Sequence, residues 1–276
     1  LKKAKKNKSF SILINELLKV RKLGPYDIVI DLQGIIKSAF IAWLIPSKKT
    51  VGFDKLSVRE EVASIFYNKV YRCKYDENIV LRNIQLINFA IGSNITKDEI
   101  NKKNPYLLSE NIQGIFNLST TRNNILIVTG ASYEAKIYPA RKFVKLVKKI
   151  DANFFLTWGT DEEKKIANEI AGSSENAKVI EKLNLISLIS LISRVDLVIG
   201  GDTGPTHMAW AMNIPSITLY GPTPGNRNSY ETIQNQIIES ETEVNPFKIN
   251  KADFSIREIR VDDIVKMSRK LLKGIE

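Results

Sequence analysis

Short apolar segments rich in β-branched residues alternate in this chain with segments of helical period. The apolar segments are YDIVIDL at 26–32, NNILIVTG at 123–130, NFFLTWG at 153–159, VDLVIGG at 195–201 and SITLYG at 216–221. Segments of helical length separate the last four. Because parallel strands need crossover connections, and these are usually helices, the alternation predicts an α/β fold of the doubly wound class.

Helical patterns and one polar stretch predict the domain organisation. PARKFVKLVKKI at 139–150 places Phe143, Val144, Val147 and Ile150 on one stripe of a helix. The segment at 161–171 follows the next predicted strand, and both segments are expected to be crossover helices. The polar stretch at 110–124 is the candidate linker. We therefore expect an N-terminal domain, a C-terminal domain and a terminal helix, at residues 1–117, 118–256 and 257–276.

Composition narrows the partners and the kinds of site. The 276 residues carry a net charge of +11, which favours anionic partners such as nucleic acid, lipid phosphate or a nucleotide diphosphate. A lysine-rich solvated surface explains the same excess equally well. One cysteine and one histidine cannot build a protein zinc site. No apolar run approaches the roughly 20 residues of a membrane span, so we expect a soluble or peripheral protein.

The turn after VDLVIGG is the strongest local signal. Asp202-Thr203-Gly204-Pro205 follows the strand directly and opens a helix that carries the single histidine, His207. Free backbone N–H groups at such a helix start bind phosphate or diphosphate. A dinucleotide fingerprint would need glycine where Ile199 stands, and no Walker sequence occurs. A capped helix after a buried strand remains an equal alternative.

The only imidazole has two interpretations at this turn. A neutral His207 ring could donate to a phosphoryl oxygen or a hydroxyl, or it could be a packed structural residue. The carboxylate of Asp202 would be repelled by a diphosphate unless it caps the helix or accepts hydrogen bonds from sugar hydroxyls. A second turn at 220–223 closes the next strand, so two loops are predicted to flank one ligand.

Three motifs in order resemble the lipopolysaccharide heptosyltransferases, glycosyltransferase family 9, and most closely their type I group. Asp202-Thr203-Gly204 with His207, followed by NIPSITLYGPT, is similar to the donor signature. YDIVIDLQGIIKSA at 26–39 and VREEVASIFYN at 58–68 are similar to N-terminal family segments. The resemblance covers essentially the whole chain.

The resemblance implies a GT-B fold, in which two Rossmann-like domains face a cleft, with ADP-heptose held by the C-terminal domain. It also implies inverting transfer of L-glycero-D-manno-heptose to the Kdo of Kdo2-lipid A, with no metal and no cofactor. The chain contains no Asp-x-Asp pair, so lysine and backbone N–H groups must meet the diphosphate charge.

Donor residues follow from the same resemblance. Lys136 matches the phosphate-binding lysine, and Ser132 matches one of two usual hydroxyl residues, whereas Ala131 departs from the pattern. Glu163 matches the ribose carboxylate, although Thr160-x-x-Glu163 is also a capping box. The implied donor set is Ser132, Lys136, Glu163, Asp202, Thr203, Gly204 and His207.

Acceptor residues lie in the first half. Lys37 and Arg59 match basic residues that face Kdo, and Arg82 is a weaker candidate that a surface ion pair explains better. The family base is an Asp after the first strand. We expect the N-terminal domain to lack that strand and the catalytic base to lie upstream of Leu1, with Asp31 structural or part of the acceptor site. Two explanations stay open: the sequence lacks an N-terminal segment, or the protein is a truncated, inactive homologue.

Two alternatives stay open. Another family 9 sugar-nucleotide transferase, such as one with a type II acceptor, fits the departure at Ala131. A non-catalytic basic membrane or nucleic-acid module fits the charge, but no nucleic-acid recognition motif is present, so we expect no nucleic-acid partner. Lys2, Lys3, Lys5, Lys6 and Lys8 predict docking on anionic lipid. The expected location is cytoplasmic, peripheral on the inner face of the inner membrane.

Overall fold

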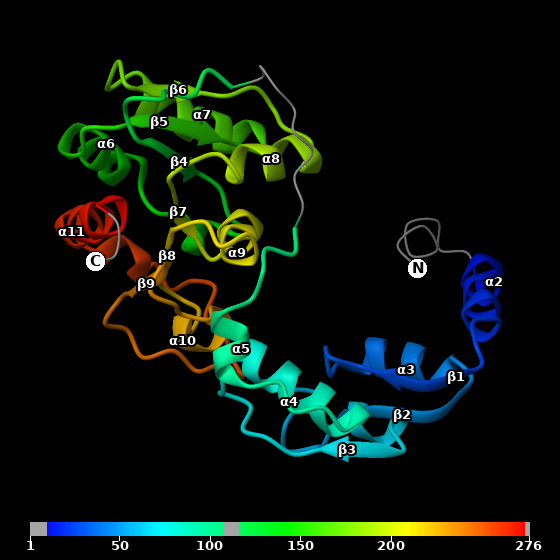
Figure 1. The fold of residues 1–276 in the computed structure, drawn as a ribbon. Helices are drawn as coiled ribbons and strands as arrows, with labels where there is room; N and C mark the ends of the chain where they lie inside the picture. Colours follow the sequence, from blue (N-terminus) through cyan, green and yellow to red (C-terminus); the bar gives the residue numbers. More distant parts are fainter. Residues whose placement is uncertain (1–9, 108–115, 274–276) are drawn as a thin grey trace. The chain divides into compact units, whose positions relative to one another are not determined.

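The protein has two α/β units, each with its own parallel sheet (Figure 1). The computed structural model describes residues 10–107 and 116–273. Unit 1 comprises residues 1–100 and unit 2 residues 101–276. All five predicted strands form, which confirms the fold class expected from the alternation.

Unit 1 is built on a sheet of three parallel strands. Their order is β1 (Tyr26–Ile30), β2 (Ser47–Phe53) and β3 (Lys69–Tyr71). The other elements are α2 (Phe10–Arg21), α3 (Ile36–Leu44), the 3₁₀ helix η1 (Glu61–Phe66), α4 (Ile79–Ile91) and α5 (Lys97–Asn101). Leu86 of α4 packs on Val51 and Phe53 of β2, and α3 packs beside η1.

Unit 2 is built on a sheet of six parallel strands with helices between them. The strands are β4 (Asn124–Val128), β5 (Asn153–Thr157), β6 (Ala177–Val179), β7 (Leu197–Gly201), β8 (Ser216–Tyr220) and β9 (Asn235–Glu239). The helices are η2 (Glu134–Lys136), α6 (Ala140–Lys149), α7 (Asp161–Ala171), α8 (Leu185–Ile192), α9 (Gly204–Ala211), α10 (Gly225–Asn228), η3 (Ser255–Glu258) and α11 (Val261–Leu272).

Alternate side chains of the central strands enter two different cores. Ile125 and Ile127 of β4 pack under α6, α7 and α11, whereas Leu126 and Val128 pack under α8 and α9. Successive side chains of a strand point to opposite faces, so a sheet covered on both sides requires a continuous apolar run. This explains why NILIV is buried at every position.

The order of the six strands locates the candidate site. The sheet reads β6-β5-β4-β7-β8-β9, so the chain changes direction across the sheet between β4 and β7. Ligands of doubly wound folds bind outside the carboxyl ends of the strands at such a switch point. The loops after β4, β5 and β7 are therefore where a ligand is expected.

The division between the units comes earlier than the predicted boundary after residue 117. Tyr106 N donates to Ala211 O at 3.2 Å, and the Asn213 side chain donates to Lys103 O at 2.8 Å. Phe116 is buried in the unit 2 core. The stretch at 110–124 is polar without being the division, and its residues 110–115 lie outside the described part.

Both ends of the chain bear on earlier predictions. Ile264 and Leu271 of α11 are buried in the core of unit 2, as the terminal pattern predicts. The five lysines between residues 2 and 8 lie outside the described residues, and α2 begins at Phe10. Over residues 10–107 and 116–273, no helix has the length and apolarity needed to cross a membrane.

Candidate functional site

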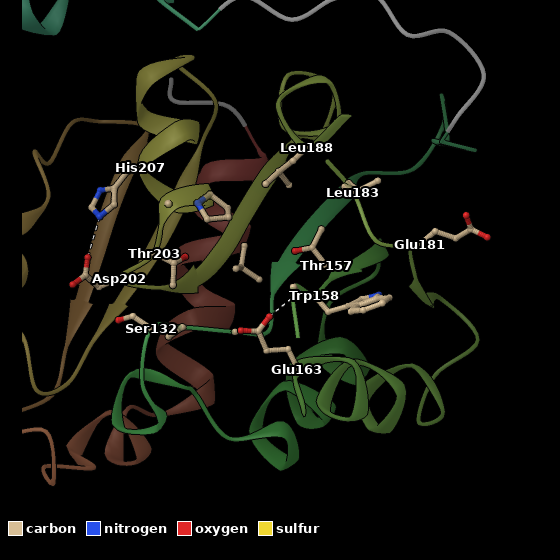
Figure 2. A pocket seen from close by; sticks show the side chains of 16 residues that line it. Ser132, Thr157, Trp158, Glu163, Glu181, Leu183, Leu188, Asp202, Thr203 and His207 are labelled. Atoms are coloured by element: carbon tan, nitrogen blue, oxygen red, sulfur yellow. Dashed lines mark hydrogen bonds and ion pairs between the residues drawn. The ribbon is translucent and has the colours of Figure 1, made fainter. Parts of the chain in front are cut away.

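A cavity of about 490 Å³ opens where β4, β5 and β7 end (Figure 2). Three loops line it, one after each strand, together with the start of α8 and its preceding loop. It holds six of the seven predicted donor residues: Ser132, Glu163, Asp202, Thr203, Gly204 and His207. The Asp-Thr-Gly turn therefore lies at the topological switch point. The sequence predicted a ligand site at the turn, but not its place at the switch point.

Glycines in β7 allow the loop after β4 to reach this turn. A Cβ on Gly201 would lie 2.6 Å from the backbone oxygen of Lys136, and one on Gly200 would lie 2.8 Å from Cβ of Val128. No larger residue fits without a backbone shift. The consequence is that η2 lies against the end of β7 and brings Lys136 beside Asp202.

Asp202 is the centre of a charged cluster. Its Oδ2 lies 2.8 Å from Lys136 Nζ, and its Oδ1 lies 3.0 Å from His207 Nε2. The Lys136 and Asp202 side chains are 10% and 11% exposed, whereas His207 is 42% exposed. Because a carboxylate only accepts hydrogen bonds, this contact puts the proton of the neutral His207 ring on Nε2.

The cluster keeps Asp202 ionised. Burial by itself raises the pKa of Asp202, but the hydrogen bond from His207 and the charge of Lys136 outweigh it. The pKa of Asp202 therefore lies well below the usual range of an aspartate. Transferring two charges from water into the protein costs about as much free energy as their mutual attraction returns. Such a buried pair therefore indicates function more than stability.

The second predicted turn converges on the same carboxylate. Thr223 Oγ1 donates to Asp202 Oδ2 at 3.1 Å, and Asn228 Nδ2 donates to it at 3.4 Å. Tyr220, at the end of β8, bonds Ser229 at 2.6 Å. The Asp202 carboxylate does not cap α9, because Thr203 is the N-cap residue, with φ −143° and ψ 166°. Asp202 instead links the two loops to Lys136 and to the His207 ring.

Glu163 takes the capping role that rivalled its ligand role. Its Oε2 accepts from Gly159 N at 2.6 Å and Thr160 N at 3.2 Å, and its own N–H donates to Thr160 Oγ1 at 3.3 Å. The carboxylate also lines the cavity, lying so close to Gly130 that no Cβ fits there. Capping and ligand contact are compatible, because Oε1 makes no hydrogen bond among the described residues.

The rest of the cavity wall is mainly apolar. Trp158 lines it and donates Nε1–H to Ile180 O at 2.8 Å. The Nζ atoms of Lys164 and Lys182 lie 4.6 and 5.5 Å from the centre of the Trp158 ring. Leu183 and Leu188 line it from the loop before α8 and from α8 itself. In Figure 2 the side chains of Trp158, Leu183 and Leu188 lie across the cavity from Ser132 and Asp202. The cavity therefore has a mainly apolar part, which Glu181 also lines, and a charged part.

The described residues contain no group of three His, Cys, Asp or Glu side chains arranged to hold a metal ion. Two positive groups lie at the charged part: the start of α9, which lines the cavity, and Lys136, which does not line it but contacts Asp202, a residue that does. These groups and Ser132 suit an anionic ligand, because N–H and O–H donors bind phosphoryl oxygens.

The predicted acceptor residues lie in unit 1. Lys37, in the first turn of α3, and Arg59, before η1, are both exposed. Ile36 N donates to Glu60 Oε2 at 2.8 Å, so the two motifs that supply these cations meet at the start of α3. Neither cation has a described ion-pair partner.

Asp31 directly follows β1, and both of its carboxylate oxygens accept hydrogen bonds from neutral donors. Its oxygens accept from Ser38 Oγ at 2.8 Å and Tyr67 OH at 2.6 Å, and from the backbone N–H groups of Gln33 and Gly34. Of the two roles considered for it, this network supports the structural one. Gly34, at φ +65°, allows the turn that wraps around the carboxylate.

The surface ion pair expected for Arg82 is wrong. The side chain is 2% exposed, donates to Ser57 O at 2.6 Å and to Lys74 O, and lies 4.6 Å from the Phe53 ring. It ties the segment after β3 to the core of unit 1. Its position on the apolar side of α4 was the sequence signal that could have shown this.

Sequence reasoning missed Trp158, Leu183, Leu188 and Asn228. Trp158 lies at the end of the strand segment predicted at 153–159, so its place at a carboxyl edge was the available signal. Leu183 and Leu188 lie between the strands predicted at 153–159 and 195–201, in a region that the sequence identified only as being of helical length. Asn228 reaches the site only through the folding of α10, which no local pattern indicates.

Comparisons with known proteins agree with this geometry. Residues 17–252 match the family described as glycosyltransferase family 9 (heptosyltransferase). The chain is 36% identical to lipopolysaccharide heptosyltransferase 1 of Campylobacter coli, over 96% of this chain and 82% of the relative. It is 27% identical to lipopolysaccharide heptosyltransferase 1 of Escherichia coli (strain K12), over 74% and 64%.

Solved structures show the same fold. The E. coli heptosyltransferase WaaC with ADP superposes with a TM-score of 0.74 at 21% identity, covering 98% of this chain and 81% of that one. A family 9 glycosyl transferase from Veillonella parvula gives a TM-score of 0.71 at 19% identity, covering 96% and 79%. The GT-B fold predicted from the three motifs is confirmed, and the chain belongs to glycosyltransferase family 9, the heptosyltransferases.

Proposed function

We propose that this chain transfers L-glycero-D-manno-heptose from ADP-heptose to the Kdo of Kdo2-lipid A, with inversion, in the inner core of lipopolysaccharide. The observation that carries the proposal is the Lys136–Asp202–His207 cluster at the switch-point cavity of a family 9 chain. The relatives named lipopolysaccharide heptosyltransferase 1 support the choice of donor and acceptor.

The donor fits the cavity in one direction. The adenine packs in the apolar part against Trp158, Leu183 and Leu188, and Glu163 accepts from the ribose hydroxyls with Oε1. The diphosphate then meets Ser132, Lys136 and the start of α9 at Thr203 and Gly204. The heptose lies beside His207, whose ring is partly exposed to the cavity.

Transfer breaks the bond between the anomeric carbon and the diphosphate oxygen while the Kdo hydroxyl attacks from the opposite face. Negative charge grows on the departing ADP, and Lys136 and the backbone N–H groups of α9 stabilise it in place of a metal ion or cofactor. The proton of the attacking hydroxyl passes to a base, which we assign to none of the described residues, because Asp31 is fully hydrogen-bonded and Asp202 is ion-paired.

The acceptor side uses exposed cations. Lys37 and Arg59 lie where the two N-terminal motifs meet, and they pair with the carboxylate and phosphate groups of the lipid-borne sugar. We place the protein at the cytoplasmic face of the inner membrane as a peripheral protein. Trp43, Val62 and Ile65 are more than half exposed on α3 and η1. Such residues near cations suit an anionic lipid surface.

Calorimetric titration with ADP-heptose, ADP and UDP-glucose tests the donor, and an acceptor swap tests the rest. We expect ADP-heptose and ADP to bind and UDP-glucose not to. Kdo2-lipid A should accept heptose, whereas an acceptor that already carries the first heptose should not. Transfer only to that second acceptor would favour a type II activity, which the departure at Ala131 leaves as the alternative.

Membrane association has its own measurement. Flotation with vesicles containing phosphatidylglycerol should recover the protein, and vesicles of phosphatidylcholine alone should not. Equal recovery from both would remove the charge-dependent part of the proposal.

A further inference from the structure

The C-terminal end of α9 is held by a lysine from a distant part of the sequence. Lys103 Nζ donates to Trp210 O at 2.6 Å and contacts Ala211 O at 3.5 Å and the Asn213 side-chain oxygen. Asn213 returns a hydrogen bond to Lys103 O at 2.8 Å. Hydrogen bonds therefore run in both directions between Lys103 and Asn213, which are 110 residues apart in the sequence.

Aromatic rings enclose the ammonium group. Lys103 Nζ lies 4.6 Å from the Trp210 ring and 5.4 Å from the Tyr106 ring, and these rings meet edge to face at 6.0 Å. Tyr106 N also donates to Ala211 O. A cation near ring faces and at the carbonyl groups of a helix C-terminus is stabilised by both.

The helix needs this cation because its own sequence lacks one. The last turn of α9 carries no basic residue, and Asn213, two residues after the end of the helix, has φ +58°. A positive charge at a helix C-terminus offsets the negative end of the helix dipole. Lys103 provides that charge and donates to carbonyl groups that have no partner within the helix.

The opposite end of the same eight-residue helix lies at the donor cavity. Thr203, Gly204 and His207 all belong to its first turn and line the cavity. A helix this short moves as one rigid piece, so fixing one end fixes the direction of the other. The residues that meet the diphosphate are thus oriented from the far end of α9.

We propose that Lys103 is a positioning residue of the donor site: by holding the C-terminal end of α9, it sets the place of the Thr203–His207 turn for the nucleotide diphosphate. The inference rests on the proposed function, because it takes ADP as the ligand of the cavity. Lys103 touches no ligand, and it acts through α9.

The test compares ADP affinity across four proteins. Lys103→Met keeps much of the side-chain stem and removes the charge, Lys103→Arg restores a cation, and Lys102→Met removes the exposed neighbouring charge as a control. We expect the Kd for ADP to rise about fivefold in Lys103→Met. It should stay within twofold of the unmodified protein in Lys103→Arg and Lys102→Met.

Amide hydrogen exchange separates positioning from general stability. Exchange in residues 203–212 should become at least tenfold faster in Lys103→Met, with no change in β4 or β5. Asn213→Gly provides a milder variant, because glycine suits the positive φ while the oxygen that Lys103 contacts is lost. It should show the same localised change, with a smaller rise in the Kd.

The outcomes are distinct. An unchanged Kd in Lys103→Met, or faster exchange spread over all of unit 2, would overturn the positioning role while leaving the proposed function intact. If the unmodified protein does not bind ADP at all, both the proposed function and this inference fail. A raised Kd that Lys103→Arg corrects supports the inference.

Discussion

Two buried aspartates occupy equivalent places in the two units and have opposite surroundings. Asp31 follows β1 and precedes α3, and Asp202 follows β7 and precedes α9. Asp31 is surrounded by hydroxyl and backbone N–H donors, whereas Asp202 contacts Lys136 and His207. An aspartate in the same position after a parallel strand is thus hydrogen-bonded by neutral donors in one unit and is part of a charged cluster in the other.

The difference has a chemical consequence. The neutral donors around Asp31 would gain no stronger hydrogen bonds by binding another anion in place of this carboxylate. Under the proposed function, Lys136 gains more from an arriving diphosphate, because a charged donor makes a stronger hydrogen bond with a phosphoryl oxygen than a neutral donor does. In the proposed function, Asp202 therefore holds Lys136 and the His207 ring in place before the donor binds, while Asp31 holds only its own loop.

The largest effect should come from removing the cation of the charged cluster. We expect Lys136→Met to lower kcat for heptose transfer about 100- to 1,000-fold, since an electrostatic contact to the leaving group is lost. Lys149→Met breaks the exposed pair with Asp262 and is the matched control, with less than a threefold change. Equal losses in both variants would show that Lys136 is not at the reacting group.

Replacing each aspartate by asparagine compares the two surroundings directly. Asp202→Asn leaves the Lys136 charge buried without a counterion, which should cost about 3 kcal/mol in the free energy of unfolding of unit 2. Asp31→Asn should cost unit 1 about 1 kcal/mol, because the hydroxyls of Ser38 and Tyr67 can turn to accept from the amide.

Hydrogen exchange of the strand amides measures the two units separately. The β7 amides report on Asp202→Asn, and the β1 amides report on Asp31→Asn. Equal costs in the two units would mean that the charges around Asp202 contribute nothing beyond ordinary hydrogen bonds.

The sequence predicted the charged cluster better than the neutral one, for a physical reason. Asp202 and His207 lie five residues apart across one helix start, so a local pattern contains both. Tyr67, which donates to Asp31, lies 36 residues away from it, and Asn228 lies 26 residues from Asp202. Contacts of that separation depend on the order of strands in the sheet, which no local pattern carries.

The strands divide in the same way. β4 and β7 are apolar along their length because helices cover both faces, and the sequence located them. β2 (SKKTVGF) begins with exposed lysines and is buried only in its second half, so its pattern resembled a loop. β3 and β6 have only three residues each, too few for any period to appear.

Acid should weaken unit 2 through Asp202. The pKa of Asp202 is depressed in the folded protein, so its stabilisation is fully present above the unfolded pKa of about 4 and is lost as pH falls below it. One such carboxyl gives a slope of at most about 1.4 kcal/mol per pH unit. Denaturant titrations of unit 2 between pH 5 and pH 2 should show this slope.

The same titration in Asp202→Asn provides the control. That variant should lose this part of the slope and keep whatever the other carboxyl groups contribute. An identical slope in the variant would show that Asp202 releases no stabilisation in acid, and it would remove the charged cluster as the source.

The smallest effect should come from Glu163, where capping and ligand contact can be separated. Glutamine also fits a capping box, so Glu163→Gln keeps an acceptor for Gly159 N and Thr160 N while it removes the charge that the ribose hydroxyls would meet. The melting temperature should therefore stay the same, while the Kd for ADP rises about fivefold, as expected for replacing a charged acceptor by a neutral one. Glu163→Ala should change both quantities. If Glu163→Gln leaves the Kd unchanged, Glu163 serves only the start of α7, and the ribose must be held by other groups in the cavity.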